Sequence, residues 1–198
     1  MNQKIVFLSN FMKNPGQVAA VAPSSKYVIK AVLENIDFGK AKNIVEYGPG
    51  TGPVTKALLE QMEEDSSLIC IEPNANFYSF LGKSINDPRL KLINDVAENI
   101  DFHLNKLAVR NVDYILSGIP FSLVKKEAKI SILRKTLDAL GKNGKFIVYQ
   151  QYNWHMEKHL KKYFSNVSKQ IEFRNLPPTF IFVCKKNKNT NHASSRAL

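Results

Sequence analysis

Short runs of apolar residues alternate with longer amphipathic segments through the middle of the chain. Ile44-Val45, Leu68 to Ile71 and Leu90 to Ile93 are three such runs, and each is followed by residues that are compatible with a helix. Apolar runs of about four to eight residues between polar or turn residues are typical of buried strands. The pattern predicts strands near 43–47, 68–72, 90–94, 112–117 and 145–149, and helices near 53–63, 74–84, 97–108 and 124–140.

This alternation of strand and helix predicts an α/β fold, because parallel strands need a crossover connection that a helix supplies. Two further strands are predicted near 167–174 and 179–184, and they are joined by Leu176-Pro-Pro178. That connection is too short for a crossover, so the two strands are expected to form an antiparallel hairpin. We therefore expect a mostly parallel, seven-stranded, Rossmann-like sheet with helices on both faces and a C-terminal antiparallel hairpin.

The two ends of the chain differ from this middle part. Residues 2–12 are predicted to form an amphipathic helix, which suits either insertion at a membrane interface or packing across a ligand site. A second helix is predicted over 26–36, with Ser24 or Ser25 as its N-cap. The tail is rich in Lys, Asn and Ser and has no apolar periodicity. The expected organisation is an N-terminal helical cap over 1–36, a core domain over 37–184 and a disordered basic tail over 185–198.

The composition is that of a globular protein, with 198 residues of which 44% are hydrophobic and 23% are charged. No apolar run reaches membrane-span length, and the first residues lack a signal-peptide pattern, so the cytoplasm is the expected compartment. Cys70 and Cys184 each fall in a predicted strand and are expected to be reduced and buried. The net charge of +11 favours a polyanionic partner, which nucleic acid and an anionic membrane surface both satisfy.

Glycines alternate in the loop that follows the first predicted strand. Gly48, Gly50 and Gly52 leave one side of the loop without Cβ atoms, so a ligand can approach the backbone closely. Their spacing differs from the dinucleotide pattern G-x-G-x-x-G, and Glu46 would repel an anion. A cationic ligand is favoured instead, and S-adenosyl-L-methionine (SAM) carries a sulfonium and an ammonium group.

Polar side chains also end the next two predicted strands. Glu72 follows the second strand, where a carboxylate can accept two hydrogen bonds from a ribose diol. Asn94 and Asp95 follow the third strand, at a position from which methyltransferases commonly contact the adenine amino group. Because these groups stand at successive strand ends, they predict a SAM site together with the glycine loop.

The fourth predicted strand ends in Ser117-Gly-Ile-Pro120. Ligands of open α/β sheets bind beyond the carboxyl ends of the strands, so this segment is expected to face the transferred methyl group. Pro120 fixes the backbone there, and neighbouring carbonyl groups can be aimed at an incoming amine. Tyr149, Tyr152 or Asp113 could accept the proton of the amine, although none of the three is a strong base candidate.

Several segments together resemble the bacterial SAM-dependent phospholipid N-methyltransferases, which belong to the class I methyltransferases. The segments are Asn14-Pro15, Val21-Ala-Pro-Ser-Ser25, Glu46-Tyr-Gly-Pro-Gly-Thr-Gly52, Ile71-Glu-Pro73, Ser117-Gly-Ile-Pro120 and Tyr149-Gln-Gln-Tyr152. The resemblance implies stepwise methylation of phosphatidylethanolamine towards phosphatidylcholine. It also implies a peripheral attachment to the cytoplasmic face of an anionic membrane through the N-terminal helix.

By position, the resemblance also implies which residues form the site. SAM would be held by Glu46, Gly48, Gly50, Gly52, Glu72, Asn94 and Asp95, and the transfer would be served by Ser117, Gly118, Ile119, Pro120 and Tyr149. The chain departs from the family at Phe121-Ser122, where Leu-Leu is common, and at Gln151-Tyr152, where the family often has Phe-Thr-Tyr. These departures leave the lipid specificity open.

Three alternatives remain at the level of sequence. An rRNA adenine dimethyltransferase shares the expected fold, but it has an asparagine where this chain has Gly118, while Phe121 could still stack on a base. A small-molecule amine is a further acceptor, and a SAM-binding or lipid-binding module without transfer activity is the non-enzymatic alternative. No metal is expected, because the sulfonium is already a reactive electrophile. His155 and His159 are interpreted as part of a solvated helix face.

Overall fold

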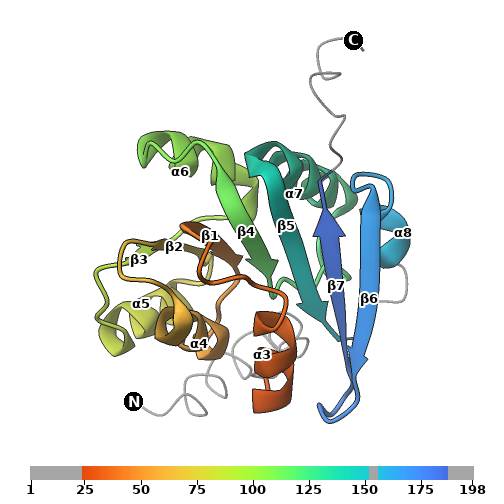
Figure 1. Cartoon of the computed structure of the whole chain (residues 1–198), viewed down its shortest axis with the longest axis horizontal. Helices are drawn as coiled ribbons and strands as arrows, with labels where there is room; N and C mark the ends of the chain where they lie inside the picture. Colours follow the sequence, from red (N-terminus) through yellow and green to blue (C-terminus); the bar gives the residue numbers. More distant parts are fainter. Residues whose placement is uncertain (1–23, 152–155, 187–198) are drawn as a thin grey trace.

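The computed structural model describes residues 24–151 and 156–186 and folds them around one seven-stranded sheet (Figure 1). Its strands are β1 (Asn43–Tyr47), β2 (Ser67–Ile71), β3 (Leu90–Ile93), β4 (Val112–Ser117), β5 (Leu140–Gln150), β6 (Asn166–Glu172) and β7 (Thr179–Lys185). The strand order is β3-β2-β1-β4-β5-β7-β6. Strands β1 to β5 run parallel, whereas β7 is antiparallel to both β5 and β6. The predicted parallel sheet and C-terminal hairpin are thus confirmed.

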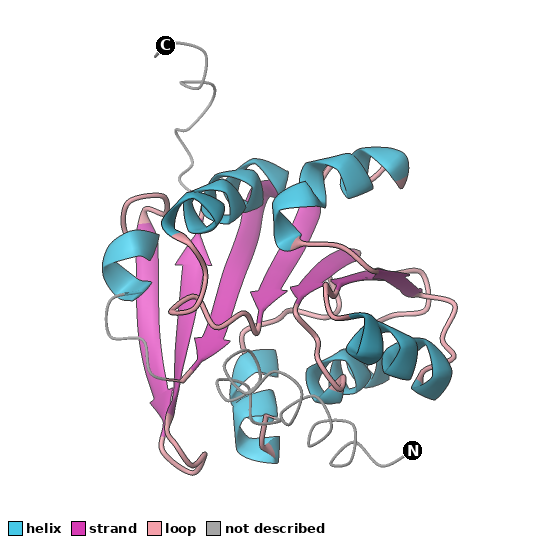
Figure 2. Ribbon diagram, turned by 180° about the vertical axis from the view of Figure 1, so that it is seen from behind, coloured by secondary structure: helices cyan, strands magenta, loops and turns pink. Residues whose placement is uncertain are grey.

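Helices cover both faces of the sheet, as Figures 1 and 2 show from opposite sides. They are α3 (Lys26–Leu33), α4 (Pro53–Gln61), α5 (Ala75–Ser84), α6 (Ile100–Lys106), α7 (Lys126–Ala139) and α8 (Met156–Leu160), with a 3-10 turn η1 (Ala97–Asn99) before α6. Helices α3 and α4 share a core with one face of the sheet. Helices α6, α7 and α8 share a second core with the other face. The two cores follow from the alternation of side chains along each strand, because successive residues point to opposite faces.

The fifth strand begins earlier than the hydrophobic pattern predicts. β5 starts at Leu140 rather than near residue 145, and the preceding helix therefore ends at Ala139. Leu140 pairs with Val112 before an irregularity in the register, and Lys145 pairs with Tyr114 after it. A Cβ atom on Gly144 would lie 2.8 Å from the carbonyl oxygen of Val112. Glycine therefore lets the strands stay close through a polar stretch that has no apolar run to reveal it.

Local signals in the sequence account for the starts of the helices that flank the site. The Ser25 hydroxyl accepts a hydrogen bond from the amide of Val28, which makes it the N-cap of α3. The side chain of Asn74 accepts from the amides of Asn76 and Phe77 at the start of α5. Both caps satisfy amide groups that have no partner within the helix.

Some predictions concern residues outside the described ranges. The helix over 2–12, Tyr152, His155 and the tail beyond residue 186 are among them, and the division into cap, core and tail stays a prediction. Cys70 and Cys184 are free and buried, as expected. Among the described residues, no helix is both long and apolar enough to cross a membrane.

Candidate active site

The loop between β1 and α4 has the backbone that its glycines predict. Gly48, Gly50 and Gly52 all have positive φ angles, of 65°, 59° and 79°. The amide of Gly48 donates to the carbonyl oxygen of Ile71 at 2.9 Å, which ties the loop to the end of β2. The amide of Gly118 donates to the carbonyl oxygen of Tyr47 at 3.0 Å, which ties the loop after β4 to the end of β1. The carboxyl ends of three neighbouring strands are thereby held together at the point where the strand order reverses.

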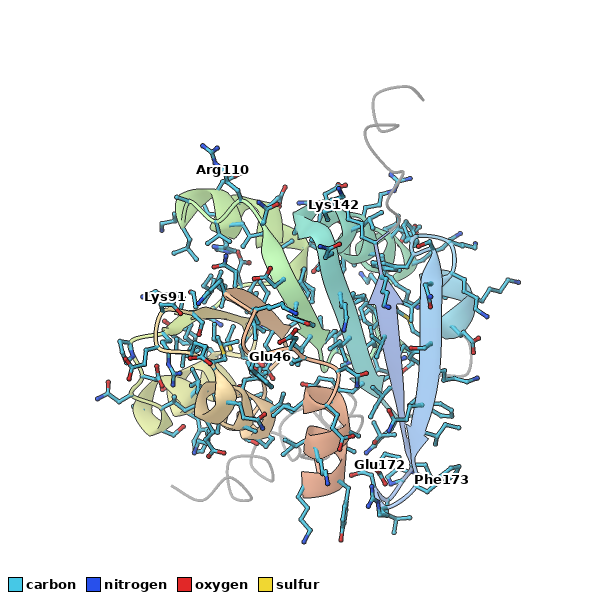
Figure 3. All side chains as sticks on the ribbon, in the orientation of Figure 1. Glu46, Lys91, Arg110, Lys142, Glu172 and Phe173 are labelled. Carbon is cyan, nitrogen blue, oxygen red and sulfur yellow. The ribbon has the colours of Figure 1, made fainter. Side chains whose placement is uncertain are left out.

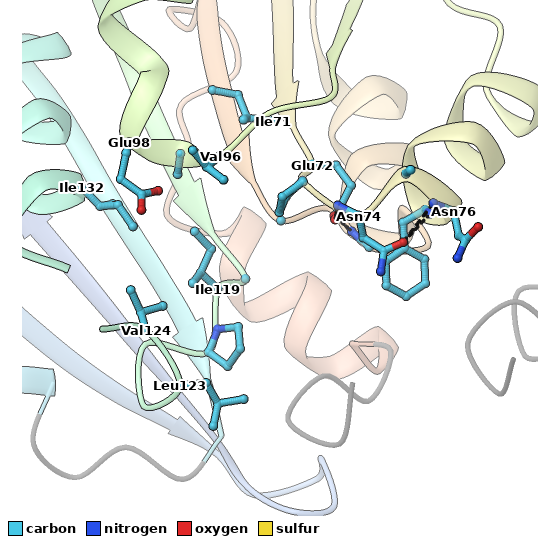
Figure 4. Close-up of a pocket in the computed structure, with 18 residues that line it drawn as sticks. Ile71, Glu72, Asn74, Asn76, Val96, Glu98, Ile119, Leu123, Val124 and Ile132 are labelled. Atoms are coloured by element: carbon cyan, nitrogen blue, oxygen red, sulfur yellow. Dashed lines mark hydrogen bonds between the residues drawn. The ribbon is translucent and has the colours of Figure 1, made fainter. Parts of the chain in front are cut away.

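A cavity of about 600 Å³ opens at this edge of the sheet (Figure 4). Its walls come from the ends of β1, β2 and β4, from the start of α5, and from the segments before α6 and α7. The lining residues are Gly48, Gly50, Ile71, Glu72, Pro73, Asn74, Ala75, Asn76, Phe77, Val96, Ala97, Glu98, Gly118, Ile119, Pro120, Leu123, Val124 and Ile132. The volume lies in the usual range for small-molecule sites, roughly 300–1,000 Å³.

Glu72 is the predicted acid that the structure places on the cavity wall. Its carboxylate accepts a hydrogen bond from the amide of Gly50 at 3.0 Å and one from the amide of Asn74 at 2.9 Å. The side chain is almost fully buried, and this burial raises the pKa of Glu72, while the two amides counteract the rise. Glu72 therefore links the glycine loop to the start of α5 and presents a fixed acceptor to the cavity.

Glu46 is the predicted acid near the end of β1, and its contact with SAM stays a prediction. It is fully buried and does not line the cavity. Its carboxyl group accepts hydrogen bonds from the Thr55 hydroxyl at 2.7 Å, from the Tyr149 hydroxyl at 3.3 Å and from the Cys70 thiol at 3.5 Å. Burial raises the pKa of Glu46 to about 7, and the three donors oppose that rise. The group braces β1 against α4, β2 and β5 from behind the glycine loop.

Asn94 and Asp95 follow β3 as predicted, but their side chains are used by the protein itself. The amide of Asn94 donates to the backbone oxygen of Glu72 at 2.7 Å. The carboxylate of Asp95 accepts from Asn99 at 3.0 Å and lies 2.7 Å from Nε2 of His103, which holds the pKa of Asp95 below its ordinary value. Neither residue lines the cavity. Their contact with the adenine of SAM stays a prediction.

The segment after β4 contributes Gly118, Ile119 and Pro120 to the cavity wall, whereas Ser117 is buried behind it. The Ser117 hydroxyl accepts a hydrogen bond from the amide of Ile119 at 3.3 Å, which shapes the turn. A Cβ atom at Gly118 would lie 3.0 Å from the Tyr149 hydroxyl and 3.2 Å from the Gly48 carbonyl oxygen. A side chain at this position would therefore press on Tyr149 and on the Gly48 backbone unless one of them shifts by a few tenths of an ångström.

Two of the suggested proton acceptors do not fit that role. Tyr149 donates to Glu46, and burial together with that neighbour raises its pKa well above the ordinary value, so its hydroxyl stays protonated. The carboxylate of Asp113 lies at the start of β4 and accepts from the amides of Lys42 and Asn43, each at 2.9 Å. Asp113 therefore lies at the opposite edge of the sheet from the cavity. The prediction that it could accept the proton of the amine was wrong.

Several lining residues could not be recognised in the sequence. Phe77 faces the cavity from the first turn of α5, and Val96 and Glu98 face it from the segment after β3. Glu98 lies on the α7 side of the cavity and Glu72 on the α5 side (Figure 4). Asn74 is the N-cap of α5 and is a residue type whose position after Glu72-Pro73 could have located the start of that helix, but no motif marks Val96 or Glu98. Among the described residues, no group of three or more His, Cys, Asp or Glu side chains is arranged to hold a metal ion.

The side chains present at the cavity fit SAM. The loop at Gly48 and Gly50 offers backbone without Cβ atoms, so an extended ligand can lie against it, and Glu72 offers a buried acceptor for a diol. The remaining walls are largely apolar, which suits a ligand with an aromatic base and excludes water from the site.

The protein is a SAM-dependent methyltransferase with a class I, Rossmann-like fold. The chain matches the Methyltransferase small domain over residues 19–174, and it belongs to that family.

Solved structures show the same fold at low sequence identity. The 1,6-didemethyltoxoflavin-N1-methyltransferase of Burkholderia thailandensis, solved with S-adenosylhomocysteine, aligns with a TM-score of 0.64 and 12% identity over 93% of this chain and 88% of that chain. An rRNA methylase from Streptococcus thermophilus aligns with a TM-score of 0.60 and 14% identity over 84% of this chain and 100% of that chain. These similarities support the fold alone.

Two curated relatives differ in how much of their length is matched. An ornithine lipid N-methyltransferase from Singulisphaera acidiphila is 26% identical over 191 residues, which cover 96% of this chain and 100% of the relative. A ribosomal RNA small subunit methyltransferase A from Mesomycoplasma hyopneumoniae is 31% identical over 99 residues, which cover 50% of this chain and 35% of the relative. The lipid enzyme is therefore matched over its whole length and the RNA enzyme over about a third.

Proposed function

We propose that the protein transfers a methyl group from SAM to the amine of a membrane lipid. The observation that carries this proposal is the match along the full length of an ornithine lipid N-methyltransferase. The sequence resemblance points to phosphatidylethanolamine as the acceptor, and the relative points to ornithine lipid. Both lipids present an amine in a polar head group, and the net charge of +11 suits a protein that works at an anionic membrane surface.

In this proposal the chain acts by binding and positioning. When bound, SAM supplies an electrophilic methyl group. Gly48, Gly50 and Glu72 hold the cofactor side of the cavity, and Gly118 and Ile119 set how closely the acceptor can approach it. Leu123 and Val124 form an apolar rim at the acceptor side. Such a rim excludes water and accepts the apolar part of a lipid next to its head group.

Glu98 is the second carboxylate on the cavity wall, and it lies on the side of Ile132. We assign to it the attraction of the acceptor amine in its ammonium form, because opposite charges attract. Only the neutral amine has the lone pair that accepts a methyl group, so the ammonium gives its proton to solvent before transfer. Since Tyr149 stays protonated and Asp113 is at the far edge of the sheet, neither takes the proton of the amine. The role of the described residues in transfer is therefore orientation of the amine and exclusion of water.

Methylation of RNA adenine is the second candidate, because part of the chain matches an rRNA methyltransferase. In the rRNA enzymes an asparagine precedes the turn where this chain has Gly118, which carries no group that could hold the adenine amino group. This difference favours the lipid acceptor.

The acceptor is identified by incubating the protein with labelled SAM and vesicles that contain a single amine lipid in a phosphatidylglycerol background. Phosphatidylethanolamine and ornithine lipid are compared, with vesicles of phosphatidylglycerol alone as the control. The proposal expects label in the extracted lipid with at least one of the two amine lipids and none with the control. Absence of label from both lipids, under conditions in which SAM binds, would contradict the proposal.

A further inference from the structure

The two most exposed large apolar side chains among the described residues lie together in the turn between β6 and β7. The exposed fraction is 74% for Phe173 and 91% for Leu176. The turn runs from Glu172, the last residue of β6, to Thr179, the first residue of β7. Scattered single apolar residues are normal on a protein surface, but a phenylalanine and a leucine at the tip of one hairpin form a compact apolar point.

The turn is held in a fixed shape by its own polar side chains. Asn175 is buried, and its amide donates to the carbonyl oxygen of Pro177 at 2.8 Å and to the Thr179 hydroxyl at 2.9 Å. The carboxylate of Glu172 accepts from the backbone amide of Arg174 at 2.9 Å and from its guanidinium at 2.7 Å. Asn175 therefore points inward while its apolar neighbours Phe173 and Leu176 point to solvent. Their exposure is built into the fold.

The turn projects from the same edge of the sheet as the cavity. Strand pairing connects the two sites, because Tyr47 pairs with Ser117 and Ser117 pairs with Val148 near the end of β5. Gln150, at the end of β5, pairs with Phe180 next to the turn. Figure 1 shows the β6–β7 turn and the carboxyl ends of β4 and β5 pointing in the same direction, and Figure 3 shows Phe173 at that extremity, with Arg110 and Lys142 at the opposite edge.

Basic side chains lie in the turn and on α3, where Arg174 pairs with Glu172 and Lys30 pairs with Glu34. The guanidinium of Arg174 lies 4.5 Å from the ring centre of Tyr27 at the start of α3, and the amino group of Lys26 lies 5.2 Å from the same ring. The side chain of Arg174 is 63% exposed, and that of Lys30, one turn along α3, is 75% exposed. Aromatic and basic side chains around an apolar point are the composition of a site that inserts into an anionic membrane interface.

The small size of the apolar tip at Phe173 and Leu176 favours a bilayer over a protein partner. A stable protein interface buries about 800 Å² on each partner. Two apolar side chains at the end of one turn offer much less than that, whereas a bilayer needs only a small apolar point that reaches below the head groups while the cations stay among them. Leu123, on the cavity rim, is a further apolar residue at this edge and is 54% exposed.

We propose that the β6–β7 turn is a membrane-docking element that inserts Phe173 and Leu176 into an anionic bilayer and brings the mouth of the cavity to the head groups. The consequence for catalysis rests on the proposed function, but the docking itself does not. Insertion at this turn orients the carboxyl edge of the sheet towards the membrane. The acceptor amine then reaches the cavity without leaving the bilayer.

The test compares the full chain with a Phe173→Ser, Leu176→Ser double variant in co-sedimentation with phosphatidylglycerol vesicles. Burial of two such side chains predicts that the partition coefficient of the variant falls by roughly tenfold or more. The matched control is Phe102→Ser, because Phe102 is also exposed, at 63%, but lies on α6. This control is expected to bind vesicles like the parent, and all three proteins are expected to bind SAM equally.

The charge of the bilayer provides the second arm of the test. The parent is expected to bind phosphatidylcholine vesicles more weakly than phosphatidylglycerol vesicles, and Lys26→Glu is expected to weaken only the anionic binding. Equal vesicle binding by the parent and the double variant, or equal loss in Phe102→Ser, would overturn the docking proposal. So would a double variant that loses binding to RNA instead of to vesicles.

Failure of the docking proposal is distinguishable from failure of the proposed function. If lipid is methylated and the double variant binds and methylates vesicles like the parent, the docking role is overturned and the function stands. If the double variant loses vesicle binding but neither protein methylates lipid, the docking role is supported and the function is overturned.

Discussion

At the residue scale, Glu46 shows how a polar residue in a predicted site can serve the protein from behind it. The sequence places this acid next to the glycine loop, where a contact with a cationic ligand is the natural interpretation. The strand alternation turns its side chain into the core, towards Thr55, Cys70 and Tyr149, and its contact with SAM stays a prediction. That orientation depends on neighbours that are distant in sequence, so no local pattern could have revealed it.

The buried carboxyl of Glu46 is expected to make stability depend on pH. Its pKa is raised from 4.5 to about 7 in the folded protein. The folded state therefore binds the proton more tightly than the unfolded state, and this stabilisation is full below about pH 4.5 and is lost as the pH rises to about 7. A shift of this size corresponds to about 3 kcal/mol.

The measurement is the free energy of unfolding of the parent and of Glu46→Gln by urea titration between pH 5 and pH 8. The difference between the two proteins isolates this one titration, because the remaining groups are shared. The stability of the variant is expected to rise relative to that of the parent as the pH increases. Profiles that run parallel over the whole range would show that Glu46 does not titrate there.

Gly118 permits the close approach of the loops after β1 and β4. Gly118→Ala would place a Cβ atom 3.2 Å from the Gly48 carbonyl oxygen, and that backbone atom can only give way if the loop moves. We expect the transfer rate to fall by about tenfold or more and the free energy of unfolding to fall by about 1–3 kcal/mol. Methyl-transfer kinetics and urea unfolding measure both effects, and a variant with the parent's rate and stability would contradict this reading of the contact.

At the scale of the element, the hydrophobic pattern predicted the sheet well wherever a strand is buried on both faces. β1, β2 and β4 consist largely of buried residues, and their predicted bounds agree with the structure to within one residue. The start of β5 was missed because residues 141–144 are polar or small, and Lys142 and Asn143 are exposed there. Pairing with β4, a long-range interaction, extends that strand beyond its apolar run.

Gly82 lies outside the cavity, so its substitution tests the stability of helix α5 alone. Gly82 lies inside α5, and a Cβ atom added to it would meet only ordinary contact, with a Leu92 methyl at 3.8 Å. Gly82→Ala is therefore expected to stabilise the protein by about 0.5–1 kcal/mol, because alanine loses less conformational entropy in a helix. Thermal and urea unfolding check this gain, with SAM affinity expected to be unchanged. A loss of stability would show that α5 is not a regular helix at this point.

At the scale of the whole molecule, the site exists because the sheet brings distant strand ends to one edge. Gly48, Gly50, Glu72 and residues 118–120 carry local motifs in the sequence, and all of them line the cavity. It could not identify Val96, Glu98 or Leu123, whose participation depends only on where the sheet places their loops. The same edge carries the exposed turn at Phe173, so the cavity and the proposed docking turn lie at one edge of the sheet.

Transfer in one vessel tests the central claim most directly. Labelled SAM is mixed with the protein, with phosphatidylglycerol vesicles containing phosphatidylethanolamine and ornithine lipid, and with total RNA. The lipid and RNA fractions are then separated, and the label in each is counted.

Glu72→Ala removes a buried hydrogen-bond acceptor, so the affinity of this variant for SAM is expected to fall by roughly ten- to a hundredfold. Glu60→Ala, an exposed acid on α4, is the matched control. Label in the lipid fraction for the parent and Glu60→Ala, reduced in Glu72→Ala, is the predicted result, and label confined to RNA would contradict the account.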